Sequence, residues 1–198
     1  MHKRKETPEE QRKVLPTKKQ HLRRRAGKPG EPGASGLSHV VGALGRARSR
    51  MVDVGAKAIT ARTALARAIV RIRGRILPRL LERGGPKGPL QELARAAGVL
   101  AAKRTGELIP LCHPLGLDFV DVEFRALDRQ RLEILCRTNC RGRTGVEMEA
   151  LVGAALAALT VVDMTKALDP GVSIERLELL EKRGGRSGPW RRENGGPE

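Results

Sequence analysis

The uninterrupted apolar stretch at residues 150–168 limits most strongly what this chain can fold into. It is rich in Ala, Leu and Val and has no Gly or Pro after Gly153, so it predicts a helix that is apolar on nearly every face. A helix of this kind is buried in a core or in a subunit contact, and we expect the other elements to pack around it. Glu147 and Glu149 stand two apart just before it and are expected on one side of an ending strand.

Near the end of this helix, Asp163 and Lys166 are three positions apart and are therefore neighbours on its surface. One interpretation is an ordinary ion pair at a helix end. The other is an acid–base pair in a partly buried wall, where burial and the opposite charge tune both pKa values. Along a straight helix, Glu149 and Asp163 lie about 21 Å apart. If both serve one substrate, the site is assembled from two subunits.

The positive charge of the chain, formally +17, raises the hypothesis of nucleic-acid binding. The first 50 residues hold 14 Lys and Arg against 4 acidic residues, so most of the excess lies there. The remainder is only moderately basic, which suits a phosphorylated small substrate as well as RNA. Residues 1–36 combine low hydrophobicity with high charge, which predicts a disordered basic tail.

The tail lacks the apolar segment of a secretory signal. Its acidic residues count against an organellar transit peptide, so the expected location is the cytoplasm; an organellar matrix follows only if the tail is a transit segment. No apolar run reaches membrane-spanning length without a charge, so a soluble protein is expected. Cys112, Cys136 and Cys140 are odd in number and irregularly spaced, which favours a reducing compartment. They lack a Cys-x2-Cys knuckle, so no zinc site is expected.

The order of predicted elements indicates an α+β fold. Strands are predicted at 49–54, 119–126, 131–138 and 172–180, and helices at 57–76, 90–105 and 150–168. Apart from one extra helix, this order is the βαββαβ pattern of a ferredoxin-like sandwich with an antiparallel sheet. That fold hosts enzymes and RNA-binding modules alike, so it does not decide function.

Two loops carry candidate functional residues. A Gly- and Pro-rich loop at 82–89 contains a single lysine, Lys87. Another loop, at 108–117, contains two prolines that exclude regular structure around Cys112 and His113. His113 is either a packed, hydrogen-bonded residue or a substrate contact, for which its near-neutral pKa is suited.

Several segments taken together resemble the MoaC family of cyclic pyranopterin monophosphate synthases, which act in molybdenum cofactor biosynthesis. They are LSHV, MVDVGAKA, AAKRTGELIPLCHPL, TGVEMEALVGAALAALTVVDMTKA and KRGGRSG. The resemblance covers about residues 37–192, which implies a single catalytic domain between the tail and a flexible C-terminus at 193–198. It also implies a homohexamer of three dimers, with each site at a dimer interface.

The resemblance implies conversion of 3′,8-cyclo-7,8-dihydro-GTP to cyclic pyranopterin monophosphate with release of diphosphate, a lyase reaction that needs no redox cofactor. Whether Mg²⁺ accompanies the triphosphate stays open. By matching motif, the catalytic residues are Asp163, Lys166 and Lys87. The implied substrate-binding residues are Leu111, Cys112, His113, Met148, Glu149, Glu147, Lys103, Arg62 and Lys182.

This chain departs from the family pattern at three positions. Pro89 follows Lys87-Gly88 where the family usually has Asp, and it is expected to stiffen the loop. Val162 replaces an aromatic residue before the active-site Asp. Arg186 stands where many members have Lys, which keeps the charge and changes the hydrogen-bond geometry.

The rival hypothesis is a ferredoxin-like RNA-binding module with a basic tail. Such modules stack bases on aromatic residues of the sheet. Phe119 and Phe124 are an odd number of residues apart on one predicted strand and point to opposite faces, so they form no platform. A purely structural hexamer would have no need of charged residues embedded in apolar surroundings, where unpaired charges are costly.

Overall fold

The computed structural model describes residues 49–193. The predicted basic tail at 1–36 and nearly all of the predicted flexible C-terminus lie outside these residues, as does the LSHV segment. The described part is an antiparallel five-stranded sheet with the order β2-β3-β1-β4-β5. The strands are β1 (Thr60–Arg71), β2 (Phe119–Ala126), β3 (Arg131–Gly142), β4 (Ser173–Arg183) and β5 (Trp190–Arg191). The helices are α1 (Leu77–Arg83), α2 (Leu90–Lys103), α3 (Thr105–Leu108) and α4 (Glu147–Thr165).

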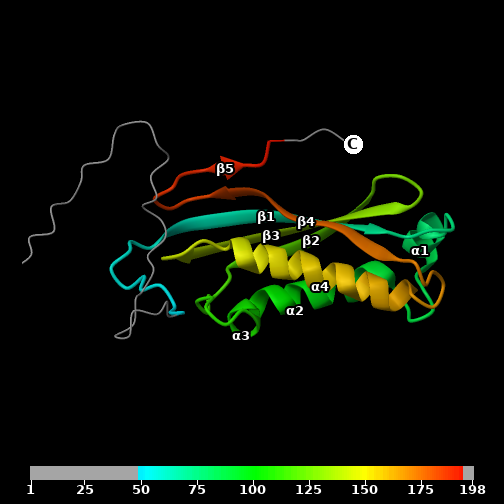
Figure 1. The fold of residues 1–198 in the computed structure, drawn as a ribbon, viewed down its shortest axis with the longest axis horizontal. Coiled ribbons are helices and arrows are strands. Elements are labelled where there is room, and N and C mark those ends of the chain that lie inside the picture. Colours follow the sequence, from blue (N-terminus) through cyan, green and yellow to red (C-terminus); the bar gives the residue numbers. More distant parts are fainter. Residues whose placement is uncertain (1–48, 194–198) are drawn as a thin grey trace, which may run out of the picture. The chain divides into compact units, whose positions relative to one another are not determined.

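The helices α2 and α4 lie side by side on one face of the sheet (Figure 1). Helices fill the connection from β1 to β2, a hairpin joins β2 to β3, and α4 connects β3 to β4. This arrangement confirms the predicted α+β fold with the βαββαβ pattern. The long apolar helix is confirmed as α4, and the second predicted helix as α2. The strand β5, which the sequence did not predict, extends the sheet beyond β4.

The prediction of a helix at 57–76 was wrong, because most of that stretch forms β1. Its alanines alternate with other residues, and Ala64, Ala66 and Ala68 are all buried on the helix-covered face. Ala favours helices as an isolated residue, but here pairing with β3 and β4 on both sides decides the conformation. The predicted strand at 49–54 is also absent from the described residues, where these six residues form no regular element.

Glu147 and Glu149 do not share one side of a strand, as the sequence had suggested. Both lie in the first turn of α4, where residues two apart point about 200° away from each other. Glu149 consequently faces the interior and is 1% exposed, whereas Glu147 faces a cavity described below.

Small residues allow the helices and the sheet to approach closely. A Cβ atom added at Gly153 of α4 would lie 2.6 Å from Cys136 Sγ of β3, and one added at Gly98 of α2 would lie 2.9 Å from the Gly153 carbonyl oxygen. α4 is long and apolar enough to cross a membrane by length and composition, but 56% of that window is buried inside the fold. It is thus the core helix of this fold.

Replacement of Gly153 by Val is expected to lower the free energy of unfolding by about 2 kcal/mol or more, because the added atoms force α4 away from β3. Thermal unfolding followed by circular dichroism measures this loss. Gly116→Ala is the matched control, since a Cβ there meets nothing within 4 Å. Equal thermal stability of the Gly153→Val and Gly116→Ala proteins would contradict the tight packing between α4 and β3.

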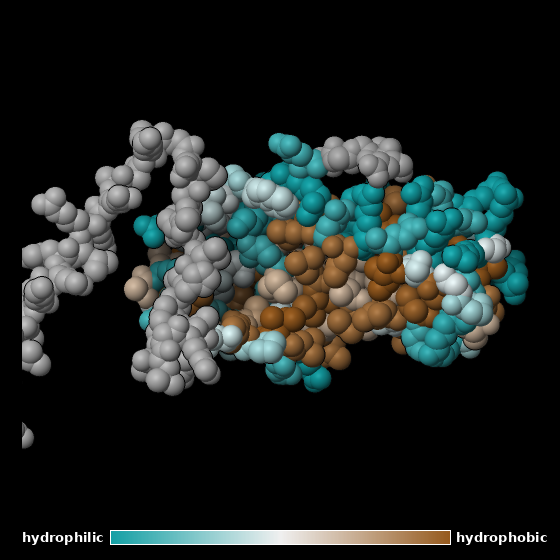
Figure 2. Space-filling model, in the orientation of Figure 1, coloured by the Kyte–Doolittle hydropathy of each residue, from teal (hydrophilic) through white to brown (hydrophobic). Residues whose placement is uncertain are grey.

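The outer surface of α2 and α4 is extensively apolar (Figure 2). Exposed residues of this apolar helical face are Leu93, Leu100, Met148 and Leu159. The opposite face of the sheet is charged instead: Arg67 pairs with Glu133 and Glu178, and Arg125 pairs with Glu133. Because large exposed apolar patches mark interaction surfaces, the helical face is the one suited to contact another protein surface.

Candidate active site

The first cluster of functional side chains lies at the C-terminal end of α4. The Asp163 carboxylate is held by two lysines: Oδ2 lies 2.6 Å from Lys87 Nζ, and Oδ1 lies 2.8 Å from Lys166 Nζ. Lys166 is three residues along the same helix end, as the spacing predicted. Lys87 comes from the loop between α1 and α2, 76 positions away in sequence. The structure therefore unites all three predicted catalytic residues.

Lys87 is positioned by a tight turn. The amides of Gly85 and Gly88 each donate to the other's carbonyl, with N–O distances of 2.9 and 3.0 Å. Gly88 has a φ of 110°, which side-chain-bearing residues rarely adopt. Pro89 follows directly as the N-cap residue of α2. Lys87 of this closed turn contacts Asp163, and the stiffening expected from Pro89 stays a prediction.

The two lysines keep Asp163 ionised. Hydrogen bonds from Lys166 and then from Lys87 lower the pKa of Asp163 to about 2. The carboxylate is 52% exposed in this single chain. One chain alone therefore shows an exposed ion pair at a helix end, the first of the two sequence interpretations, and not a partly buried wall.

The second cluster surrounds a cavity of about 840 Å³ at the N-terminal end of α4. The start of β1, the end of β4, the glycine-rich turn after β4 and the first turn of α4 form its walls. Among residues 49–193, its lining contains one acid, Glu147, and six cations: Lys57, Arg62, Arg143, Lys182, Arg183 and Arg186. We call this space the cationic cavity. Such a concentration of Arg and Lys suits a polyphosphate, whose charge must be offset as it leaves water.

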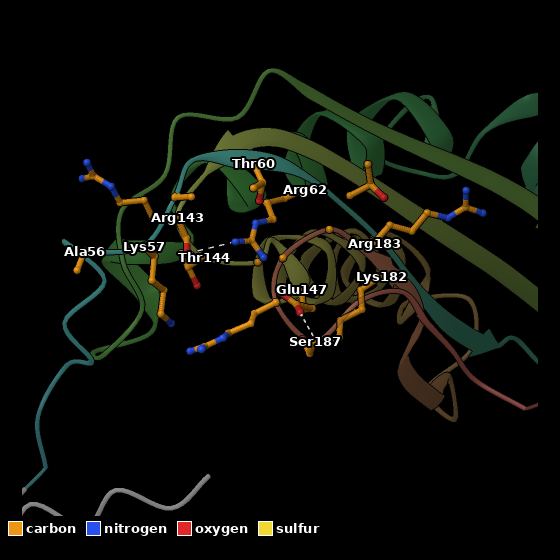
Figure 3. Close-up of a pocket in the computed structure, with 16 residues that line it drawn as sticks. Ala56, Lys57, Thr60, Arg62, Arg143, Thr144, Glu147, Lys182, Arg183 and Ser187 are labelled. Atoms are coloured by element: carbon orange, nitrogen blue, oxygen red, sulfur yellow. Dashed lines mark hydrogen bonds and ion pairs between the residues drawn. The ribbon is translucent and has the colours of Figure 1, made fainter. Parts of the chain in front are cut away.

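Arg62 and Lys182 are directed toward Glu147, while Arg143 and Arg183 point away from it (Figure 3). Lys182 Nζ lies 3.1 Å from Glu147 Oε1. Arg62 donates weakly to the carbonyls of Gly142 and Arg143, at 3.4 Å each. A side chain at Gly185 would collide with the Arg62 guanidinium. The glycine-rich turn therefore leaves the space that Arg62 needs to reach into the cavity.

A smaller cavity of about 280 Å³ adjoins the cationic cavity, with which it shares Lys57, Thr144, Gly145 and Glu147. Its distinctive lining comes from the loop before β2 and from α4: Leu111, Cys112, His113, Leu115 and Met148. His113 Nε2 lies 2.7 Å from the Val52 carbonyl oxygen, which it reaches as a donor. His113 is thus hydrogen-bonded, as the first of its two sequence interpretations expected, and its contact with a substrate stays a prediction.

Glu149 is a buried carboxylate beside this smaller cavity. Neither of its oxygens has a hydrogen-bond partner within residues 49–193. Burial, and then repulsion by Glu147, raises the pKa of Glu149 above its ordinary value. Burial and the charge of Glu149 together raise the pKa of the Cys112 and Cys140 thiols. A buried acceptor without a donor is costly to the fold, so Glu149 is suited to binding N–H groups of a ligand.

Replacement of Glu149 by Gln is expected to raise the free energy of unfolding at pH 8, because it removes the buried charge whose cost raises the pKa of this carboxyl. The raised pKa fixes the sign: the gain shrinks as pH falls, and it vanishes below about 4.3, where the unfolded carboxyl is protonated too. Denaturation at several pH values measures this gain in the free energy of unfolding. The exposed Glu107→Gln is the control, and a gain independent of pH would contradict the raised pKa.

The two clusters are far apart in one chain. Glu147 and Asp163 lie at opposite ends of α4, roughly 24 Å apart along the helix axis. A ligand of nucleotide size cannot touch both in a single chain. The cationic cavity and the acid–lysine cluster are therefore two halves of a site, or two separate sites.

Comparison with known proteins decides the family. The model of the MoaC family matches residues 51–185. The chain belongs to the MoaC family. Three similar proteins are each named cyclic pyranopterin monophosphate synthase. The one from Novosphingobium aromaticivorans is 52% identical over 143 residues, covering 72% of this chain and 90% of that protein. The one from Thermomicrobium roseum is 53% identical over 150 residues (75% and 90%), and the one from Chloroflexus aggregans 50% over 158 (79% and 94%).

Most site residues inferred from the MoaC resemblance fall into the two clusters. Arg62, Glu147 and Lys182 line the cationic cavity, although Arg62 lies on a strand and not on the predicted helix. Leu111, Cys112, His113 and Met148 line the smaller cavity, and Glu149 lies behind it. Lys103, the exposed last residue of α2, lines neither cavity.

Four cations of the cationic cavity were not assigned to a site by the sequence analysis: Lys57, Arg143, Arg183 and Arg186. Lys57 belongs to the segment MVDVGAKA, and Arg183 and Arg186 belong to KRGGRSG; both segments carried part of the MoaC resemblance and so offered a signal. Arg143 follows Gly142 in a turn, and nothing in its local spacing pointed to a cavity. Among residues 49–193, no group of three or more His, Cys, Asp or Glu side chains could hold a metal ion.

Proposed function

We propose that this chain converts 3′,8-cyclo-7,8-dihydro-GTP to cyclic pyranopterin monophosphate in molybdenum cofactor biosynthesis, and that it releases diphosphate as a phosphorus–oxygen lyase. One observation carries the proposal: a MoaC-family chain combines a cavity lined by six cations with a carboxylate held between two lysines. These are the groups that a polyanionic substrate and repeated proton transfers require.

The cationic cavity binds the triphosphate. Arg62 and Lys182 offset its charge, and the cations stabilise the diphosphate as its negative charge grows during departure. Lys182 is held by Glu147 in the ligand-free chain, so phosphate binding exchanges one anionic partner of Lys182 for another. The cavity beside it, walled by Leu111, His113 and Met148, takes the ring system, and Glu149 accepts its N–H groups if substrate binding opens a path to this buried carboxylate.

Asp163 and its lysines move protons during the ring rearrangement. Opening the five-membered ring of the purine and closing the pterin ring each need a base and an acid. Asp163 accepts a proton when one lysine turns away, and Lys166 or Lys87 returns one. This division of roles follows from the short contacts of both lysines with one carboxylate and from the lowered pKa of Asp163.

The complete site is assembled from two copies of the chain. A single chain separates the acid–lysine cluster from the cationic cavity by the length of α4, so a second copy must supply the missing half. The apolar helical face offers a surface for such assembly (Figure 2). We infer a homohexamer built as three dimers, located in the cytoplasm, or in an organellar matrix if residues 1–36 are a transit segment. No redox cofactor is required. The assay with and without Mg²⁺ tests whether the triphosphate needs this ion.

The RNA-binding alternative finds no support. Phe124 packs on the helix-covered side of the sheet, with the Arg95 guanidinium 5.4 Å from its ring centre. Phe119 alone of the two faces the other side, and that side carries the paired charges of Arg67, Glu133 and Glu178. One isolated phenylalanine does not form the stacking platform that such modules use.

Incubation of the purified protein with the cyclised dihydro-GTP tests the function. We expect a pterin that becomes fluorescent on oxidation, together with one diphosphate per pterin, with and without added Mg²⁺. If the protein released diphosphate but formed no pterin, it would be a nucleotide hydrolase and not a synthase of the pterin. Absence of both products, from a protein shown to be folded, would overturn the proposal.

A further inference from the structure

The C-terminal strand β5 forms a feature that the MoaC match does not include, since that match ends at residue 185. β5 pairs with the end of β4 so that Trp190 lies opposite Lys182 and Arg191 lies opposite Glu181. Directly opposite residues of an antiparallel pair project to the same side of the sheet. Trp190 and Lys182 are therefore neighbours on one side. Trp190, the only tryptophan of the chain, is 41% exposed.

Trp190 forms part of a third cavity, of about 590 Å³, which we call the Trp190 pocket. Its lining is Glu181, Lys182, Arg183, Gly184, Pro189, Trp190 and Arg191. Lys182, Arg183 and Gly184 also line the cationic cavity, so the two cavities lie on either side of the turn between β4 and β5. Of the described residues in this lining, three are cations and one is an acid, Glu181, which pairs with Arg137 at 3.6 Å and with Arg183 at 3.8 Å.

The indole ring is held in place. The Arg192 guanidinium lies 5.7 Å from its ring centre, within the range of a cation–π contact. Arg192 is itself anchored, because its Nε donates to the Leu179 carbonyl at 2.9 Å and lies 3.3 Å from Glu178 Oε2. An aromatic surface beside a lysine matches a ligand that has a planar ring and a phosphate.

We propose that the Trp190 pocket is a second binding site, for a phosphorylated planar heterocycle such as a purine nucleotide or a pterin phosphate. The ring stacks on Trp190, and the phosphate lies against Lys182, which projects to the same side of the strands. Because Lys182 lines both cavities, a ligand in this pocket weakens phosphate binding in the cationic cavity. The proposal does not depend on turnover, since binding here is measured separately from the reaction.

Tryptophan fluorescence of the full-length protein tests this directly, because the chain has no tyrosine and no other tryptophan. The titrants are guanosine monophosphate, which offers ring and phosphate, and ribose 5-phosphate, which offers no ring. A pterin phosphate is titrated by calorimetry, so that the two ring sources are compared. We expect quenching by guanosine monophosphate alone, and affinity about tenfold or more weaker in Trp190→Leu by calorimetry. Trp190→Phe should retain most of the affinity.

Two further variants separate the Trp190 pocket from its surroundings. Leu177→Ala alters an exposed residue of β4 outside the pocket and should bind as the unaltered protein does. Arg62→Ala alters the cationic cavity only, and quenching should persist in it. Any of three results would overturn the proposal: no quenching by guanosine monophosphate, equal quenching by ribose 5-phosphate, or loss of the quenching in Arg62→Ala. The turnover assay is a separate measurement of the reaction, so its result does not depend on whether a ligand binds in the Trp190 pocket.

Discussion

Asp163→Asn is expected to lower kcat by about a thousandfold while changing KM little, because general acid–base groups typically contribute 10²- to 10⁴-fold. Asparagine has nearly the same shape as aspartate but cannot accept a proton at the carboxylate. Asp163 contacts Lys87 and Lys166 and none of the cations that line the cationic cavity, so its loss leaves the phosphate-binding groups in place. Steady-state kinetics with the cyclised dihydro-GTP separates kcat from KM.

Asp128 provides a matched control for this variant. Its pKa is also lowered to about 2, by the Gln130 amide and by Arg131, and it lies in the turn between β2 and β3. Asp128→Asn therefore removes an equally acidic exposed carboxylate that holds neighbouring donors, yet it should leave kcat unchanged. Equal turnover by the Asp163→Asn and unaltered proteins would remove Asp163 from the mechanism.

The lowered pKa of Asp163 also has a consequence for the pH profile. With a pKa of about 2, Asp163 is ionised throughout the range above pH 4, so its own titration does not limit the rate there. Glu149 has the opposite shift, because burial raises its pKa. A fall in rate on acidification above pH 4 should therefore disappear or move in Glu149→Gln, whatever the absolute rate of that variant.

The elements that the sequence predicted well are those with a strong local pattern. α4 is apolar without interruption, and β2 and β3 alternate apolar and polar residues, so their types followed from periodicity. The strand β1 was not predicted because many of the residues that alternate along it are alanines, and alanine by itself favours a helix. The two strands beside β1 override that preference, and pairing between distant segments is not visible in a local pattern.

The same distinction between local patterns and distant contacts decides which contacts of the site could be predicted. The contact of Asp163 with Lys166 followed from a three-residue spacing on a helix. Its contact with Lys87 spans 76 positions and could be inferred only through the family resemblance. The cationic cavity gathers residues from both ends of the domain, such as Lys57 and Arg186, and no spacing rule brings these together. The opposite burial of Glu147 and Glu149 depended on whether they lie on a strand or on a helix.

Mixing two inactive variants is expected to restore activity, and this is the strongest test of a site shared between chains. Arg62→Ala damages the cationic cavity, and Asp163→Asn damages the acid–lysine cluster. In a dimer that contains one chain of each kind, one site combines both damaged halves and the other combines both intact halves. In a hexamer whose chains assort at random, half of the dimers are mixed, so doubly tagged hexamers should recover about a quarter of the unaltered rate, whereas doubly tagged dimers should recover about half.

The control for this experiment pairs two variants of the same cluster, Asp163→Asn with Lys166→Ala. Every site in such a mixture contains one damaged acid–lysine cluster, so no rate should be recovered. Chains are mixed by co-expression with different affinity tags, and mixed assemblies are purified through both tags before the assay. If those assemblies stay as inactive as their parents, each chain must complete its own site. The 24 Å separation along α4 would then require that the two clusters serve different ligands, and Asp163 could not act on a substrate held by Arg62.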